Sequence, residues 1–253
     1  MAAPDLFRVV IPARYASTRL PGKVLLPLAG KPMLQWVYER ACASRAEEVL
    51  IATDDERVVR AAQAFGAAAL MTQATHATGT DRIAELARAR AWPQTHIVVN
   101  VQGDEPLLPP LLIDQVAAEL SAQRADIATL ATPIGSLDEL LDPNVVKVVC
   151  DAQGAALYFS RAPIPWDRDG AAGITPRHFH AARRHRGIYA YRVAALERLA
   201  RLAPTVLEQC EKLEQLRALE HGLRIHVGVA CEQPGPDVNT LADLERVAAL
   251  VAP

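Results

Sequence analysis

The feature that most constrains the fold is a regular alternation of strand and helix patterns through the first half of the chain. Short apolar, β-branched runs typical of buried strands occupy residues 7–12, 48–53, 67–71, 96–102 and 126–131. Between them, apolar residues are spaced for one helix face over 32–44, about 55–65, 80–90 and 111–123. This order predicts an α/β domain with a mostly parallel central sheet covered by helices on both faces.

The pattern changes after Thr132. Residues 145–150 and 155–160 read as two strands joined by a turn at 151–154. Further on, we expect a strand at 187–192, a helix at 207–221, a strand at 224–230 and a last helix starting at Thr240. We therefore predict a single domain over 1–253, in which about 132–192 form a smaller β-containing elaboration, an oligomer contact or a lid.

Bulk properties exclude several classes of protein. The net charge of -2 gives no general attraction to nucleic acid or to an anionic membrane. The four cysteines are far apart and form no C-x-x-C pair, which disfavours a disulfide framework or a zinc site and favours a reducing compartment. The N-terminus has no signal-peptide pattern, and no run approaches the ~18 apolar residues of a membrane span. We expect a soluble, cytoplasmic protein.

A loop with three cations follows the first strand directly. Arg14, Arg19 and Lys23 lie within ten residues, beside Gly22. Ligands of open α/β sheets bind at the carboxyl ends of strands, and arginine and lysine side chains bind phosphates. No G-x-x-x-x-G-K-[ST] or G-x-G-x-x-G motif accompanies the loop. We predict a polyanion site for a nucleoside triphosphate; the alternative is a solvated basic loop.

A second polar segment follows the strand at 96–102. Gly103 lets the backbone approach a ligand closely, and Asp104 places a carboxylate beside the predicted polyphosphate, where Mg²⁺ is usually bound. Asp237 or Asn239, ahead of the last helix, would supply a further oxygen ligand. Ordinary turns and helix caps are the alternatives, and Glu105 reads as a structural acid.

Other segments carry weaker signals. The run 77–82 places small hydroxyl residues and a glycine before a helix, where they would receive a base, a ribose or a carboxylate; for Thr80, a helix cap is the alternative. Arg161 follows a strand and would hold a substrate carboxylate. Trp166 fits a sugar site or an interface. His178, His180 and His185 lack partners at metal-ligand spacing and read as solvated.

Taken in order, these motifs resemble the CMP-KDO synthetase family, the 3-deoxy-manno-octulosonate cytidylyltransferases (KDO is 3-deoxy-D-manno-octulosonate). The resemblance rests on residues 11–23, 99–106, 144–149, 156–162, 164–168, 187–191, 207–217 and 243–246. It implies a Rossmann-like nucleotidyltransferase fold and a homodimer. It also implies that CTP and KDO react, with Mg²⁺ as cofactor, to give CMP-KDO and pyrophosphate for lipopolysaccharide biosynthesis.

The resemblance also assigns roles to positions of this chain. It implies catalytic roles for Lys23, Asp104 and Arg19. It places CTP beside Pro12, Ala13, Arg14, Arg19, Lys23, Thr78 and Gly79. It places the sugar acid beside Arg82, Gln102, Arg161, His185, Tyr189, Glu208, Glu211 and Gln215. The metal would be bound by Asp104 and Asn239.

Asn239 departs from the family pattern, which has an aspartate at this position. An asparagine side chain still offers a carbonyl oxygen to Mg²⁺, but it neutralises no charge. Two alternative functions stand beside the implied one, and Asn239 bears on the second of them. The first is a cytidylyltransferase for another sugar acid, such as sialic acid, and the second is a nucleotide-binding relative without catalytic activity.

Overall fold

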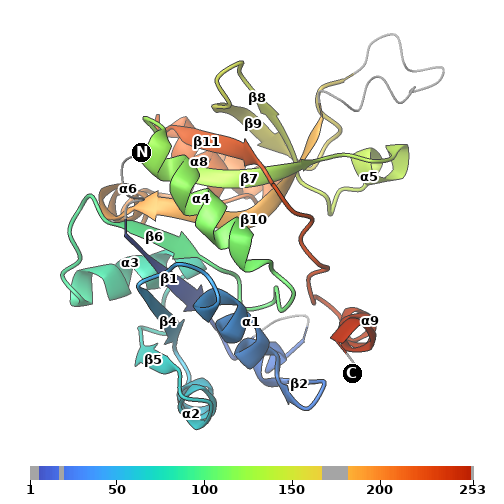
Figure 1. Ribbon diagram of the computed structural model, residues 1–253. Helices are drawn as coiled ribbons and strands as arrows, with labels where there is room; N and C mark the ends of the chain where they lie inside the picture. Colours follow the sequence, from blue (N-terminus) through green and yellow to red (C-terminus); the bar gives the residue numbers. More distant parts are fainter. Residues whose placement is uncertain (1–5, 17–19, 167–181, 252–253) are drawn as a thin grey trace.

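The computed structural model describes residues 6–16, 20–166 and 182–251. Within these ranges, a nine-stranded sheet runs through the molecule, with the main path β11-β7-β10-β6-β1-β4-β5 (Figure 1). Along this path, β10 is antiparallel to both of its neighbours and the other pairs are parallel. The strands are β1 (Phe7–Pro12), β4 (Glu48–Thr53), β5 (Ala68–Met71), β6 (Ile97–Asn100), β7 (Ile127–Pro133), β8 (Lys147–Cys150), β9 (Ala156–Ser160), β10 (Arg183–Arg192) and β11 (Ile225–Val229).

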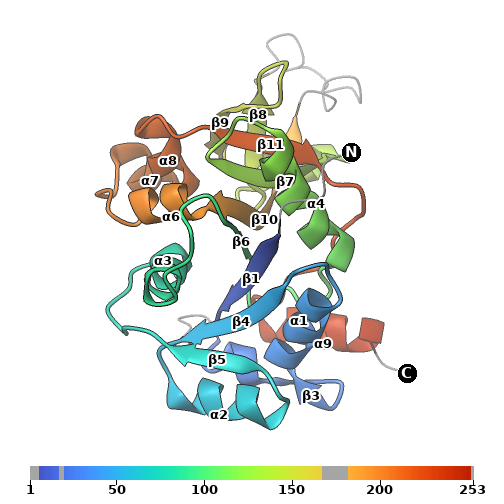
Figure 2. The ribbon, with the colours of Figure 1, turned by 60° about the vertical axis from the view of Figure 1, so that its left-hand side comes forward.

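Helices cover both faces of this sheet. The helices of the described residues are α1 (Met33–Cys42), α2 (Glu56–Ala64), α3 (Gly79–Ala89), α4 (Pro110–Ala122), α5 (Leu137–Leu141), α6 (Val193–Leu199), α7 (Val206–Glu211), α8 (Gln215–Glu220) and α9 (Leu241–Val251). A short 3-10 helix, η1 (Lys23–Leu25), and a small ribbon of β2 (Pro27–Leu28) and β3 (Lys31–Pro32) lie between β1 and α1. Figure 2 shows α6, α7 and α8 grouped together at one end of the molecule.

The central strands are apolar on both faces, which explains their continuous β-branched sequence. In β1, Val9 and Ile11 point into the core under α1 and α4, whereas Val10 points into the core under α3 and α6. In β6, Val99 and Val98 divide in the same way. A strand buried on both faces needs no polar alternation, and this pattern is typical of parallel sheets between helical layers.

Two predicted elements differ from the structure. The strand expected at 187–192 starts four residues earlier, at Arg183, because its first half pairs with β7 and β8. The helix expected at 207–221 is two helices, α7 and α8, separated at Lys212, whose φ of 56° is left-handed. The break lets α8 bury Leu216 and Ala218 while α7 buries no residue.

The predicted hairpin after residue 132 is present as β8 and β9, joined by the turn at 151–154. Its residues Val148 and Phe159 share a core cluster with Val10 of β1. Lys147, which is fully buried, donates through Nζ to the carbonyl oxygens of Asp142, Val145 and Arg161 and so fastens the base of the hairpin. In the described ranges, no helix is both long enough and apolar enough to cross a membrane.

Candidate active site

The candidate site lies along the carboxyl edge of the parallel strands. Because β4, β1 and β6 run side by side in one direction, the loops that leave them emerge together at this edge. They carry the basic loop after Pro12 and the segment after Asn100 that contains Asp104. The segment ahead of α9 joins them, since the amide of Val238 donates to the carbonyl of Asp104 at 3.0 Å.

A cavity of about 360 Å³ opens among these loops, and we call it the larger pocket. Within it, Lys23 Nζ lies 2.6 Å from Asp104 Oδ2. Gly103 allows a close approach of two loops, since a Cβ at this position would lie 3.3 Å from the carbonyl oxygen of Pro12. The lining residues are Pro12, Arg14, Ala16, Lys23, Val24, Gly79, Gln102, Gly103, Asp104 and Asn239. The pocket therefore combines two cations with the oxygen donors of Asp104 and Asn239.

A smaller pocket of about 150 Å³ shares Gly79 and Gln102 with the larger one. Its polar lining comes from elements distant in sequence, because β10 pairs with β6 and sets Tyr189 opposite Asn100. The lining residues are Gly79, Thr80, Asn100, Gln102, Ile127, Tyr189, Tyr191, Leu199, Glu214 and Gln215. Of the residues predicted to meet a sugar acid, the structure brings Gln102, Tyr189 and Gln215 to this pocket.

Glu214 is a pocket residue that sequence reasoning missed. Its Oε2 accepts a hydrogen bond from Thr80 Oγ1 at 3.0 Å, while its Oε1 is buried and receives no hydrogen bond from any described residue. Burial raises the pKa of this carboxyl above its ordinary value. In the sequence, Glu214 and Gln215 lie between Leu213 and Leu216. This placement of an acid among apolar residues is the signal that would have indicated a buried carboxyl. Its unsatisfied oxygen is suited to a ligand hydroxyl.

Thr78 and Ala13 lie beside the larger pocket without lining it. Thr78 is the N-cap of α3: its hydroxyl accepts from the Asp81 amide, and Asp81 accepts from the Thr78 amide. The capping role considered for Thr80 thus belongs to Thr78. Ala13 is buried and donates its amide to Ala52, and both residues hold pocket neighbours in place.

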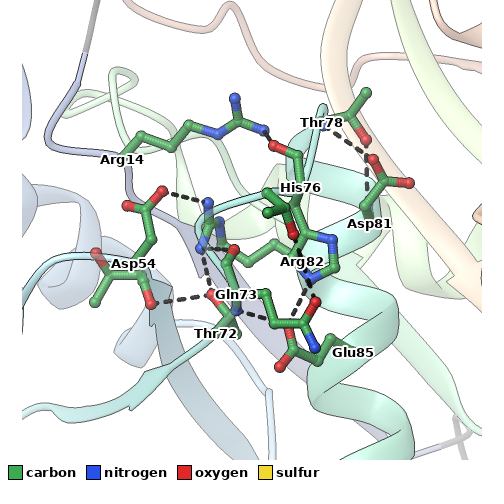
Figure 3. A network of polar contacts seen from close by, with 11 residues as sticks. Arg14, Asp54, Thr72, Gln73, His76, Thr78, Asp81, Arg82 and Glu85 are labelled. Atoms are coloured by element: carbon green, nitrogen blue, oxygen red, sulfur yellow. Dashed lines mark hydrogen bonds and ion pairs between the residues drawn. The ribbon is translucent and has the colours of Figure 1, made fainter.

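Arg82 is committed to the interior of the protein and lines neither pocket. Figure 3 shows its guanidinium among the loops that follow β4 and β5. Nη2 lies 2.8 Å from Asp54 Oδ2, and Nη1 donates to Thr72 Oγ1. The side chain is fully buried. The sugar-acid role implied for Arg82 therefore has no support from the geometry, which makes it an internal brace of the segment leading to Gly79.

The same network reaches the larger pocket through Arg14. Its Nη2 donates to the carbonyl of His76 at 2.9 Å, and His76 contacts Glu85 of α3 (Figure 3). Glu85 in turn accepts from the amide of Gln73. The loop before α3 is thus fixed at both ends, and one of its carbonyls holds a cation of the basic loop.

Three of the predicted sugar-acid residues in the second half of the chain, Arg161, Glu208 and Glu211, are engaged elsewhere. Glu211 accepts from Ser160 Oγ at 2.6 Å and from the Arg161 amide at 2.9 Å. The Arg161 guanidinium donates to the carbonyls of Glu211 and Pro143. Glu208 is paired with Arg217 and closes the capping box of α7. None of Arg161, Glu208 and Glu211 lines the smaller pocket.

His185 lines a separate cavity and contacts Tyr189 of the smaller pocket. Its ring centroid is 5.3 Å from that of Tyr189 and 5.0 Å from that of Phe159, and Nε2 is 3.0 Å from Thr129 Oγ1. Burial lowers the pKa of His185 to about 3, so the imidazole is neutral. The structure therefore makes it a support for Tyr189. Arg19, His178 and His180 lie outside the described residues.

Comparison with known proteins decides the family. Residues 8–225 match the family model described as cytidylyltransferase. A 3-deoxy-manno-octulosonate cytidylyltransferase of Thioalkalivibrio sulfidiphilus is 55% identical, with 97% of this chain and 98% of that protein covered. One of Vibrio parahaemolyticus is 54% identical with the same coverage. The chain belongs to the 3-deoxy-manno-octulosonate cytidylyltransferase family. The resemblance read from the sequence motifs is confirmed.

Solved structures support the same assignment. A CMP:2-keto-3-deoxy-manno-octonic acid synthetase complexed with CTP superposes with a TM-score of 0.87 at 42% identity, covering 97% of this chain and 98% of the other. This confirms the α/β nucleotidyltransferase fold. A cytidylyltransferase from Leptospira borgpetersenii, 18% identical with a TM-score of 0.61, shares the fold.

The segment ahead of α9 contributes to two cavities. Asn239 lines the larger pocket together with Asp104. Asp237, which was expected to assist the metal, lines a separate cavity with Glu105, Arg184 and Arg186. Burial and the neighbouring Asp237 and Asp104 carboxylates raise the pKa of Glu105 well above its ordinary value. Asp237 thus lines a different cavity from Asn239, although its pKa is raised by burial and by the nearby Asp104 carboxylate.

Proposed function

We propose that this protein transfers the cytidylyl group of CTP to KDO, giving CMP-KDO and pyrophosphate for lipopolysaccharide biosynthesis. The observation that carries the proposal is the joined pair of pockets. The larger one presents Arg14 and Lys23, which suit a triphosphate, and the smaller one is lined by hydroxyl, amide and carboxyl groups, which suit a sugar acid. Gln102 and Gly79 lie where the two substrates would meet.

The reaction forms one bond and breaks one. The anomeric hydroxyl oxygen of KDO attacks the α-phosphorus of CTP, pyrophosphate leaves in line, and the hydroxyl proton passes to solvent. The protein contributes mainly by positioning and by charge stabilisation. Arg14 and Lys23 offset charge on the phosphates. Lys23 exchanges its contact with Asp104 for phosphate oxygens, which releases the Asp104 carboxylate.

The residues of the larger pocket fit Mg²⁺, which is the expected cofactor. Asp104 offers a carboxylate and Asn239 a side-chain carbonyl from two loops that meet at one pocket. Mg²⁺ is commonly bound by one or two protein oxygen ligands together with substrate phosphates. When bound, the ion supplies charge neutralisation on the phosphates and lowers the pKa of the attacking hydroxyl.

The homodimer and the cytoplasmic location implied by the sequence belong to this proposal. In the described part of the chain, β9 pairs with β8 alone, and its Leu157 is 62% exposed. A strand with an open edge is suited to contact with another chain. We assign the elaboration at about 132–192 to this contact and to the sugar side of the site. Sedimentation equilibrium of the purified protein tests the homodimer, and a monomer at micromolar concentration would refute the homodimer.

The deciding assay measures pyrophosphate release from CTP and Mg²⁺ with and without KDO. We expect release only with KDO. Asp104→Ala should reduce turnover by at least about 100-fold while leaving the circular dichroism spectrum unchanged. Release with sialic acid in place of KDO would establish the alternative substrate. CTP binding without release for either sugar acid would establish a relative that has lost its chemistry.

A further inference from the structure

Helix α2 contacts the basic loop through one stacked pair of side chains. Arg57, in the first turn of α2, places its Cζ 3.4 Å from the centroid of the Tyr15 ring. Tyr15 directly follows Arg14, which lines the larger pocket. A guanidinium stacked at this distance on an aromatic face gains both dispersion and electrostatic attraction.

Arg57 is itself held in place. Asp55, the N-cap of α2, accepts hydrogen bonds from the Arg57 amide at 2.8 Å, from Nε at 2.9 Å and from Nη2 at 2.6 Å. The guanidinium is therefore oriented by a bidentate pair before it meets Tyr15. Arg57 is more than half exposed and does not line the larger pocket.

The Tyr15 side chain also meets the far end of the same loop. A Cβ on Gly22 would lie 3.2 Å from Cε2, Cζ and the hydroxyl oxygen of Tyr15, and the Gly22 amide donates to the Tyr15 carbonyl at 2.9 Å. Gly22 has a φ of 69° and precedes Lys23, the second cation of the pocket. The Tyr15 side chain thus contacts both α2 and the residue that precedes Lys23.

We propose that Tyr15 and Arg57 are positioning residues that set the separation of Arg14 and Lys23 for the triphosphate of CTP. Arg14 adjoins Tyr15 and Lys23 adjoins Gly22, so losing the contact between Arg57 and Tyr15 lets the two cations move apart. This inference rests on the proposed function, because it concerns how the same pocket binds CTP. Neither residue touches the reacting atoms.

The test compares CTP and CMP binding, by calorimetry with Mg²⁺ and no KDO, in three variants. Arg57→Ala should raise the Kd for CTP about 3- to 10-fold and change the Kd for CMP less than about twofold. Arg60→Ala is the matched control, since Arg60 lies one turn along α2 and pairs with Glu56 on the helix surface. Its CTP affinity and unfolding temperature should equal those of the wild type. Arg57→Lys keeps the charge but not the planar fork, so its Kd for CTP should lie between those of the wild type and Arg57→Ala.

Three outcomes would overturn the inference. One is equal CTP affinity in the Arg57 and Arg60 variants. Another is equal weakening of CTP and CMP, which would mean that the brace does not act on the phosphates. The third is additive loss when Arg57→Ala is combined with Tyr15→Leu, because residues that act through one contact lose it once. A wild-type protein that binds no CTP would instead refute the proposed function.

Discussion

At the residue scale, Arg82 and Glu214 are both buried polar groups near the site, but they differ in whether a ligand can reach them. Arg82 contacts Asp54 and Thr72 through its terminal nitrogens, and its Nε is buried with no partner among the described residues. Its side chain is fully buried and lines neither pocket, so it has little to offer a substrate. Glu214 has a buried oxygen with no described donor, and this is the kind of group that a ligand hydroxyl satisfies. Each of the two side chains has one buried atom without a partner among the described residues, so what separates them is the smaller pocket, which Glu214 lines and Arg82 does not.

Arg82 should therefore matter for stability and not for KDO affinity. Removing one member of a buried ion pair costs about 3–5 kcal/mol, so Arg82→Met should lower the melting temperature by roughly 10 °C. The KM for KDO, measured well below that temperature, should stay within about twofold. Arg88→Met, on the exposed side of α3, is the control. A raised KM at an unchanged melting temperature would restore the sugar-acid role of Arg82.

Glu214 should make stability depend on pH. Because burial raises its pKa in the folded state, its neutral form is favoured there. Its contribution is fully present below the unfolded pKa of about 4.5 and is lost as the pH rises through the folded pKa. Glu214→Gln removes this loss, so the melting temperature of the variant relative to the wild type should increase from pH 4.5 to pH 8. Glu220→Gln, at the exposed end of α8, should show no such trend. If the difference in melting temperature between Glu214→Gln and the wild type did not change with pH, Glu214 would not be a buried carboxyl.

Asn239 should weaken the binding of Mg²⁺ relative to a carboxylate at the same position. Site affinity for hard cations rises with the number of charged ligands. Asn239→Asp should therefore lower the Mg²⁺ concentration needed for half-maximal CTP binding by about 3- to 10-fold. A titration of CTP binding with Mg²⁺, in the absence of KDO, measures this concentration. Gln233→Glu, which also turns an amide into a carboxylate on that segment, controls for the effect of one added negative charge. An unchanged or higher Mg²⁺ requirement would leave Asn239 only its contact with Asp243, ahead of α9.

At the scale of elements, the sequence predicted what short-range periodicity records. The strand and helix order through β7 and the β8–β9 hairpin follow from local patterns of apolar residues. The division of α7 from α8 does not, because residues 207–221 keep a helical spacing and the break depends on Glu211 reaching Ser160 and Arg161. The early start of β10 likewise depends on partners in β7 and β8, which are distant in sequence.

The break between these helices should respond to substitution at Lys212. A non-glycine residue at a φ of 56° pays a steric penalty that glycine avoids. Lys212→Gly should raise the unfolding free energy by about 0.5–1 kcal/mol and the melting temperature by roughly 2 °C. Lys212→Val should lower both. If glycine destabilised as much as valine in thermal denaturation, the left-handed conformation would not be the strained one.

At the scale of the whole molecule, the two halves of the site were unequally visible in the sequence. The cation-lined half lies in loops that follow predicted strands, so Arg14, Lys23 and Asp104 could be selected from local context. The other half combines Asn100 with Tyr189, which meet only because an antiparallel strand inserts beside β6. No spacing rule records that pairing, and the family resemblance supplied part of what local patterns could not.

The same architecture predicts one cooperative unit whose stability CTP controls. The cores on both faces are built from alternate residues of the same strands, β1 and β6, so neither face can lose its packing alone. Calorimetry should show one transition, and CTP with Mg²⁺ at 100 times its Kd should add about 2.7 kcal/mol, or roughly 5–10 °C. Lys23→Ala should abolish most of this shift because the triphosphate loses its central cation. Two transitions, of which CTP moves only one, would show that the pockets belong to a part that unfolds independently, and the shared-strand argument would then fail.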